Sequence, residues 1–147
     1  GIKWAIAQIP SHPMRHDLSR PHIGHVAIKT ADFKAQQDFY ERILGLELLD
    51  SGQDHAIYTQ NKPNHPFIIL LTGGEVVHYD PDSVRPPERA HPFFLSLMTP
   101  ELSTVLETIN QQGLALLRSV THHADWGGTD VVIKDADGNA IQIVQYP

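Results

Sequence analysis

Hydrophobic and polar residues follow the same order in two successive parts of the chain. In the first part, an alternating stretch at 22–30 precedes an apolar face with helical spacing over 32–44, and three short alternating stretches follow at 46–51, 54–60 and 66–72. Alternation is typical of half-buried strands, and apolar residues three and four positions apart are typical of an amphipathic helix. This part therefore predicts one strand, one helix and three strands.

The second part repeats that order. Strands are predicted over 91–98, 115–120, 129–135 and 139–146. The helix between the first two is expected to be capped by Thr99, to have Pro100 at its first position and to end at Gly113. Such a repeat determines the architecture.

The repeat predicts an α+β fold of two tandem βαβββ modules whose curved mixed sheets form a cup. A helix on one face of each sheet leaves the other face free to line that cup. The expected boundaries within one structural domain are an N-terminal arm at 1–21, a first module at 22–75, a linker at 76–90 and a second module at 91–147.

Composition narrows the classes of protein and partner. The 147 residues are 41% hydrophobic and 19% charged, a balance typical of soluble globular domains. A formal net charge of −6 weighs against nucleic acid as a partner, and no apolar run approaches the roughly 20 residues that span a bilayer. The absence of cysteine excludes disulfides and thiolate metal sites. A cytoplasmic protein with no nucleic-acid or membrane partner is expected.

Alternation places several polar side chains on the cup faces. In the last strand, Ile141 and Ile143 point to the core, so Gln142 points to the cup. His25 and Lys29 share one face of the first strand. Lys29 is therefore a candidate acid/base or electrostatic group, although a lysine there can also reach the solvated rim.

Aromatic and further histidine side chains are also candidates for ligand contact. Phe93 and Leu95 share a face with His91, which predicts an apolar wall suited to an aromatic or hydrophobic ligand. In the loop before the seventh strand, His122, His123 and Trp126 could stack on or hydrogen-bond a ligand. In the third strand, alternation leaves open whether His55, Ile57 and Thr59 or Ala56, Tyr58 and Gln60 face the cup.

Two segments, HIGHVAIKTADFKAQQDFYERILGLEL and DADGNAIQIVQ, resemble the vicinal oxygen chelate superfamily, which includes glyoxalases, bleomycin resistance proteins and extradiol dioxygenases. The resemblance covers about residues 22–146. It implies a cup in which a divalent metal ion chelates neighbouring oxygens of the substrate. It also implies a homodimer.

The resemblance further implies where metal ligands would lie, on the first and last strands of each module. His25 stands at one such position and Gln142 at another, where a glutamate is usual, while His91 lies near a third. Leu70 stands at the fourth, where glyoxalases carry a carboxylate, and leucine cannot ligate. The metal set would then be His25, His91 and Gln142, and the ion Fe, Mn, Zn or Ni. The alternative is a cup without metal.

Three functions remain open at this point. The first is binding of a small aromatic or hydrophobic molecule in a cup with an incomplete metal site. The second is a metal-dependent enzyme similar to extradiol dioxygenases, with His25 beside the metal. The third is a metal-independent isomerase or lyase that uses Lys29 or a cup histidine as a base. The two missing carboxylates weigh against a glyoxalase.

Overall fold

The structure, a computed structural model, describes residues 20–21, 23–60 and 66–147. The predicted arm therefore lies outside the described residues except at Arg20 and Pro21, as does His22 of the first predicted strand. Within the described ranges, the elements follow the predicted order of strand, helix and three strands, repeated once.

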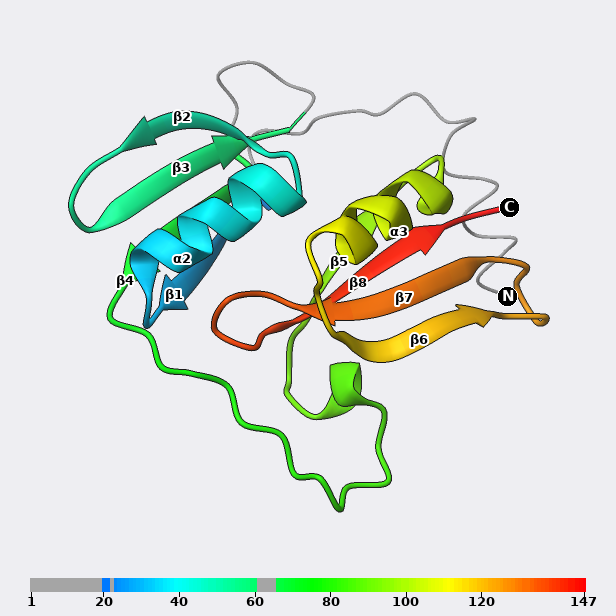
Figure 1. Cartoon of the computed structure of the whole chain (residues 1–147). Coiled ribbons are helices and arrows are strands. Elements are labelled where there is room, and N and C mark those ends of the chain that lie inside the picture. Colours follow the sequence, from blue (N-terminus) through cyan, green and yellow to red (C-terminus); the bar gives the residue numbers. More distant parts are fainter. Residues whose placement is uncertain (1–19, 22, 61–65) are drawn as a thin grey trace.

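Each module forms its own four-stranded sheet (Figure 1). The first sheet has the order β1-β4-β3-β2 and consists of β1 (Val26–Thr30), β2 (Glu47–Ser51), β3 (His55–Thr59) and β4 (Ile68–Thr72). The second has the matching order β5-β8-β7-β6 and consists of β5 (Leu95–Met98), β6 (Leu116–His122), β7 (Thr129–Lys134) and β8 (Ala140–Gln145). In each sheet the first and last strands are parallel and the other pairs antiparallel, which confirms the predicted α+β fold.

The helix of the first module changes its geometry along its length. It starts as α2 (Phe33–Asp38) and continues as a π-helical segment, η2 (Phe39–Ile43), in which the Leu44 N–H bonds the Phe39 carbonyl. Asp32 caps its start by accepting a hydrogen bond from the Ala35 N–H at 3.2 Å.

The helix of the second module, α3 (Leu102–Gln111), begins later than predicted. Its N-cap residue, Glu101, makes no side-chain cap bond, and the Leu102 N–H instead donates to Gln145 Oε1 at 2.6 Å. The expected cap residue Thr99 accepts a hydrogen bond from the Glu101 N–H at 3.2 Å, but it lies before the helix start, and a side chain from the end of β8 satisfies the first N–H of the helix. A short 3-10 helix, η3 (Pro87–Arg89), lies in the linker.

The hydrophobic core lies between the sheets and the two helices, which cover the same side of the molecule (Figure 1). Ala56, Tyr58 and Leu70 are fully buried in this core. The parity that the sequence left open in β3 is thereby decided, because Tyr58 points to the helix side. Leu70 also points there, so it does not stand on the open face of the sheet.

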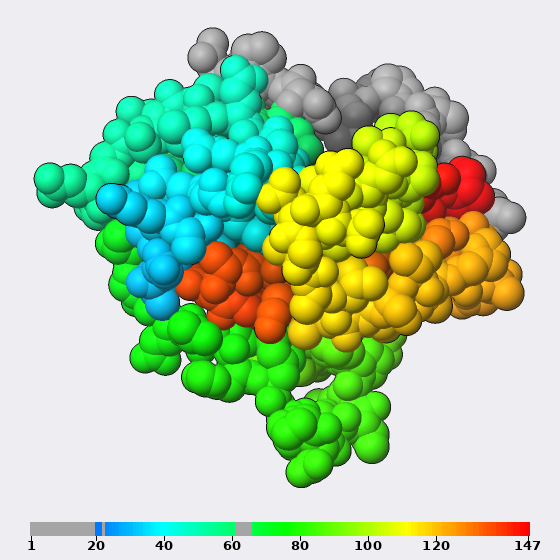
Figure 2. All heavy atoms as spheres, viewed as in Figure 1, coloured from blue at the N-terminus to red at the C-terminus, as the bar shows by residue number. Residues whose placement is uncertain are grey.

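The DADGN turn before β8 joins the two modules. Asp135 accepts hydrogen bonds from Gln36 Nε2 at 2.8 Å and from the Tyr40 hydroxyl at 2.9 Å, both on the helix of the first module. Asp137 accepts from the Ala31 N–H at 3.1 Å. Figure 2 shows this orange turn filling the space between the cyan helix and the yellow one.

The Gln36 side chain bonds the turn through both ends of its amide. Gln36 is fully buried, and its Oε1 accepts from the Ala136 N–H at 2.9 Å while its Nε2 also reaches Asp137. Burial raises the pKa of Asp135, although the hydrogen bonds from Asn139 and Tyr40 lower it. We call the set Gln36, Tyr40, Asp135 and Asp137 the intermodule clasp.

Candidate functional site

An open pocket of about 420 Å³ lies between the first strands of the two modules. Residues of β1, of the start of β5 and of the start of β8 line it, together with Tyr40: Val26, Ala27, Ile28, Lys29, Phe93, Phe94, Leu95, Asn139, Ala140 and Ile141. The walls are mainly apolar, and Lys29 is the single charged residue among them. We call this the intermodule pocket.

Three residues singled out in the sequence meet at this pocket: Lys29, Phe93 and Leu95. Phe93 is 91% exposed, whereas Leu95 packs against the core. The register pairs Leu95 with Ile141 and Ser96 with Gln142, so Leu95 borders the pocket from the core side of β5, and its contact with a ligand stays a prediction. Tyr58 does not line the pocket and is fully buried in the core, a position that a ligand does not reach in this structure.

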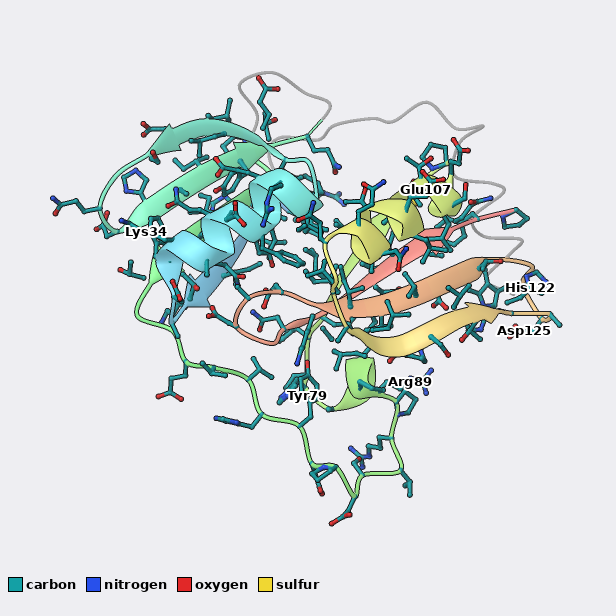
Figure 3. The ribbon with its side chains drawn as sticks, viewed as in Figure 1. Lys34, Tyr79, Arg89, Glu107, His122 and Asp125 are labelled. Carbon is teal, nitrogen blue, oxygen red and sulfur yellow. The ribbon has the colours of Figure 1, made fainter. Side chains whose placement is uncertain are left out.

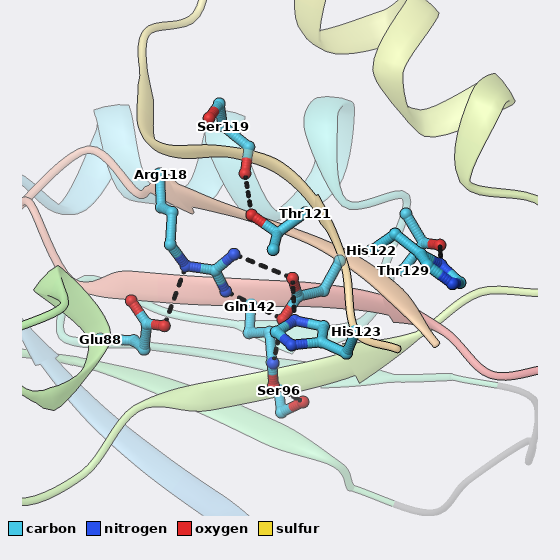
Figure 4. Close-up of polar contacts among 10 residues, drawn as sticks. Glu88, Ser96, Arg118, Ser119, Thr121, His122, His123, Thr129 and Gln142 are labelled. Carbon is cyan, nitrogen blue, oxygen red and sulfur yellow. Dashed lines mark hydrogen bonds and ion pairs between the residues drawn. The ribbon is translucent and has the colours of Figure 1, made fainter. Parts of the chain in front are cut away.

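A second group of polar side chains lies on the face of the second sheet that points away from the helices (Figure 4). Its centre is Asp130 of β7, whose exposed fraction is 1%. Arg118 of β6 donates to both carboxylate oxygens, from Nη1 and Nη2, each at 2.9 Å. Arg118 Nε donates to Glu88 Oε1 of η3 at 3.0 Å. We call this group, with Gln142, Ser96 and His123, the Asp130 network.

The Asp130 carboxylate is held ionised. Burial by itself would raise its pKa, but hydrogen bonds from Arg118, Gln142 and His123 outweigh burial and bring the pKa to about 2. The same contacts raise the pKa of Arg118, so the pair stays charged throughout the physiological range. A buried, fully paired charge of this kind is a rigid anchor for its neighbours.

Gln142 belongs to this network. Its Nε2 donates to Asp130 Oδ2 at 2.6 Å, and its Oε1 accepts from the Ser96 hydroxyl at 2.7 Å. Asp130 is an acceptor only, which determines the orientation of the amide. The polar residue on the outer face of β8 therefore completes a hydrogen-bond network, and both ends of its amide are engaged.

His123 and Trp126 also join the network, whereas His122 does not. His123 Nε2 lies 2.9 Å from Asp130 Oδ1, and its ring stacks on Trp126 with centroids 5.0 Å apart. His122 is exposed and pairs with the Thr129 hydroxyl at 3.0 Å. Figure 3 shows His122 near the outer end of the β6–β7 hairpin, with Asp125 beside it in the turn.

A divalent metal ion needs several nitrogen or oxygen ligands close together. Among the described residues, no group of three or more His, Asp or Glu side chains is arranged to hold an ion. His25 is exposed, and exposed His91 packs edge-to-face on Tyr79 in the linker, with ring centroids 5.3 Å apart. The set of His25, His91 and the Gln142 amide stays a prediction, and the bonds already made by Gln142 weigh against it.

Sequence reasoning missed four members of the Asp130 network: Glu88, Ser96, Arg118 and Asp130. One signal was available in β8, where Gln142 interrupts an apolar run, whereas Asp130 only precedes the apolar run of β7. Glu88 and Arg118 carried no such signal. Glu88 comes from the linker, and a bulge between Leu116 and Arg118 shifts the alternation of β6.

Comparisons with known proteins agree with this fold. The family model described as Glyoxalase/Bleomycin resistance protein/Dioxygenase superfamily matches residues 22–143. No curated protein matches the chain significantly. Within the described residues, no helix is long and apolar enough to cross a membrane.

Solved structures show the same architecture at low sequence identity. An integron cassette protein from the mobile metagenome of V. cholerae is 22% identical with a TM-score of 0.61, and the match covers 92% of this chain and 100% of that one. Lactoylglutathione lyase from Agrobacterium tumefaciens is 14% identical with a TM-score of 0.62, covering 86% and 94%. A glyoxalase/bleomycin resistance protein/dioxygenase from Alicyclobacillus acidocaldarius is 14% identical with a TM-score of 0.63, covering 85% and 91%.

Proposed function

The chain belongs to the glyoxalase/bleomycin resistance protein/dioxygenase superfamily, and from this premise we propose that it binds a small aromatic or hydrophobic molecule in the intermodule pocket. The observation that carries the proposal is the pocket itself, which both modules line with mainly apolar side chains. Its size of about 420 Å³ lies within the range of small-molecule sites.

Lys29 would favour ligands that carry a negative charge. Its ammonium is the single charge among the lining residues, and Asn139 adds an amide that can donate or accept. Phe93 and Phe94 offer aromatic surfaces beside it. A planar aromatic ring that carries a carboxylate fits these groups best.

The proposal is tested by titrating the protein with 2-naphthoate, a planar aromatic carboxylate, and following backbone amide signals by NMR. We expect the shifts to concentrate on β1 and on the starts of β5 and β8.

Lys29→Met should weaken binding about threefold, as for one partly solvated ion pair. Ala27→Trp should fill the pocket and abolish binding. Lys34→Met, an exposed lysine of α2 outside the pocket, and Ala124→Trp, an exposed alanine of the β6–β7 hairpin, are the matched controls.

Equal affinity in the wild type and in Ala27→Trp would contradict the proposal. So would a set of shifted signals that lies elsewhere in the chain.

The proposal uses no metal ion, because both ends of the Gln142 amide are engaged by Ser96 and Asp130. We therefore expect elemental mass spectrometry of untagged protein, purified without chelators, to find less than about a tenth of an equivalent of Fe, Mn, Zn or Ni. The content should not change in His25→Ala. Near one equivalent of metal, lost in that variant, would instead establish a metal site that includes His25.

A further inference from the structure

The β6–β7 hairpin holds His123 in one orientation. The Nε2 atom of His123 faces Asp130 at 2.9 Å, and the ring stacks on Trp126 at an interplanar angle of 20°. The His123 N–H donates to the Gly128 carbonyl at 2.8 Å, and the Gly127 N–H donates to the His123 carbonyl at 2.7 Å. Backbone and ring are thus both constrained.

The two glycines of the hairpin allow this arrangement. Gly127 has a φ of +83°, a conformation that side chains rarely adopt. A Cβ atom added at Gly128 would clash with the Trp126 ring, so that ring occupies the space of a side chain there. The WGG sequence therefore lets the indole fold back onto His123.

The bond to Asp130 determines which ring nitrogen of His123 carries the proton. Asp130 accepts hydrogen bonds from both Nη atoms of Arg118 and from Gln142 Nε2, so its carboxylate is an acceptor toward His123 as well. Nε2 must then carry hydrogen, so in the tautomer that this bond selects Nδ1 is the ring nitrogen with a lone pair. Among the described residues, no donor reaches Nδ1.

His123 and Asp130 differ in how far their side chains are exposed to solvent. The Asp130 side chain is 1% exposed, whereas the His123 side chain is 29% exposed. A buried carboxylate that holds a partly exposed imidazole polarises it and makes the far nitrogen a better acceptor. This is the arrangement of a binding site for a hydrogen-bond donor, and it shares no residue with the lining of the intermodule pocket.

We propose that His123 Nδ1 is the acceptor of a second ligand site, which takes small molecules with a weakly acidic hydroxyl, of the phenol class. A phenol is a stronger donor than an aliphatic alcohol because its hydroxyl is more acidic. The edge of Trp126, which also contacts Tyr146, supplies an aromatic wall beside His123. The hydrogen bond needs neither a metal ion nor a cofactor.

The first test reads the tautomer directly from the ring ¹⁵N shifts of His123 at neutral pH, in the wild-type protein. We expect a protonated Nε2 and an unprotonated Nδ1. A protonated Nδ1 in the neutral ring would overturn the proposal, whatever the ligand.

The second test uses 4-nitrophenol, whose absorption reports its hydrogen bonding. In Ala27→Trp, whose intermodule pocket is filled, we expect it to bind at one site and to shift the His123 Nδ1 signal. His123→Phe keeps a ring against Trp126 but removes the acceptor, and it should weaken binding about tenfold, the loss expected for one good hydrogen bond. His122→Phe alters the neighbouring exposed histidine and should leave the affinity unchanged.

Two results would overturn the choice of ligand and site. One is the absence of binding by 4-nitrophenol at millimolar concentration, and the other is equal affinity in His123→Phe and the wild type. Affinities with and without His123→Phe are both measured in the Ala27→Trp background, which blocks the intermodule pocket, so this site and the pocket are tested separately.

Discussion

Individual residues show how one buried charge organises the open face of the second sheet. Asp130 is bound by Arg118, His123 and Gln142, so three strands and the hairpin between two of them converge on one carboxylate. The two neighbouring histidines consequently have different partners. His123 is captured by the carboxylate, whereas His122, one residue earlier, points to solvent beside Thr129.

At this scale we predict an acid-sensitive contribution to stability from Asp130. Its pKa is about 2 in the folded protein against 3.8 ordinarily. A lowered folded-state pKa stabilises the fold by about 2 kcal/mol above pH 4, and that stability is lost as the pH falls toward 2. Urea unfolding of wild type and Asp130→Asn should therefore differ most near neutral pH and converge in acid.

Asp125→Asn is the matched control for this experiment. Asp125 is exposed on the same hairpin, so its removal should change the free energy of unfolding by less than about 0.5 kcal/mol at any pH. A difference between wild type and Asp130→Asn that stays constant from neutral pH to acid would show that Asp130 is not held ionised.

Secondary-structure elements in this protein are joined by polar side chains as well as by the core. The intermodule clasp connects the helix of the first module to the turn before β8 through Gln36, Asp135 and Asp137. The first turn of α3 is capped by Gln145 of β8. Each contact joins segments that are distant in sequence, because buried polar groups must find partners wherever the fold brings them.

At the scale of elements we predict that Gln36→Met destabilises the protein by about 2–4 kcal/mol. Methionine has a similar volume, but it leaves the Ala136 N–H and the two carboxylates of the clasp without their amide partner. Denaturant unfolding followed by circular dichroism measures the loss. Lys34→Met, on an exposed position of the same helix, should cost less than about 0.5 kcal/mol. Equal effects of the two substitutions would refute a stabilising role for the clasp.

The whole molecule leaves apolar side chains beside two free strand edges. Within the described chain, β1 pairs with β4 alone and β5 with β8 alone, so each has an unpaired edge. On or before these strands, Ile23 is 89% exposed, Phe93 91% and Met98 73%. Exposed apolar residues beside open edges are typical of surfaces that another chain covers.

We therefore expect the protein to form a homodimer through this surface. Light scattering coupled to size exclusion should report twice the chain mass. Phe93→Asp should raise the dissociation constant at least about tenfold by placing a charge in the contact. Val84→Asp, at an equally exposed position in the linker, should leave the dimer intact. A wild-type protein that is monomeric at high micromolar concentration would rule out the dimer.

The order of elements was readable from the sequence by itself, because hydrophobic periodicity is local. Among the described residues, alternation and helical spacing predicted the eight strands and the helix of each module, and the helix starting at Phe33 and Gly113 at the end of α3 lie where expected. The two quoted segments were enough to indicate the superfamily. These features depend on residues near one another in the sequence, so their periodicity can be read without knowing what lies across the sheet.

The partners of polar side chains were decided only by the tertiary structure. Alternation placed Gln142 on the cup face of β8, but its bonds to Ser96 and Asp130 depend on strand order and register. Alternation left both faces of β3 open, and only packing across the sheet shows that Tyr58 is buried in the core and that Leu95 packs against it. Arg118 reaches Asp130 across a bulge, and Glu88 reaches Arg118 from the linker, contacts that no local pattern contains.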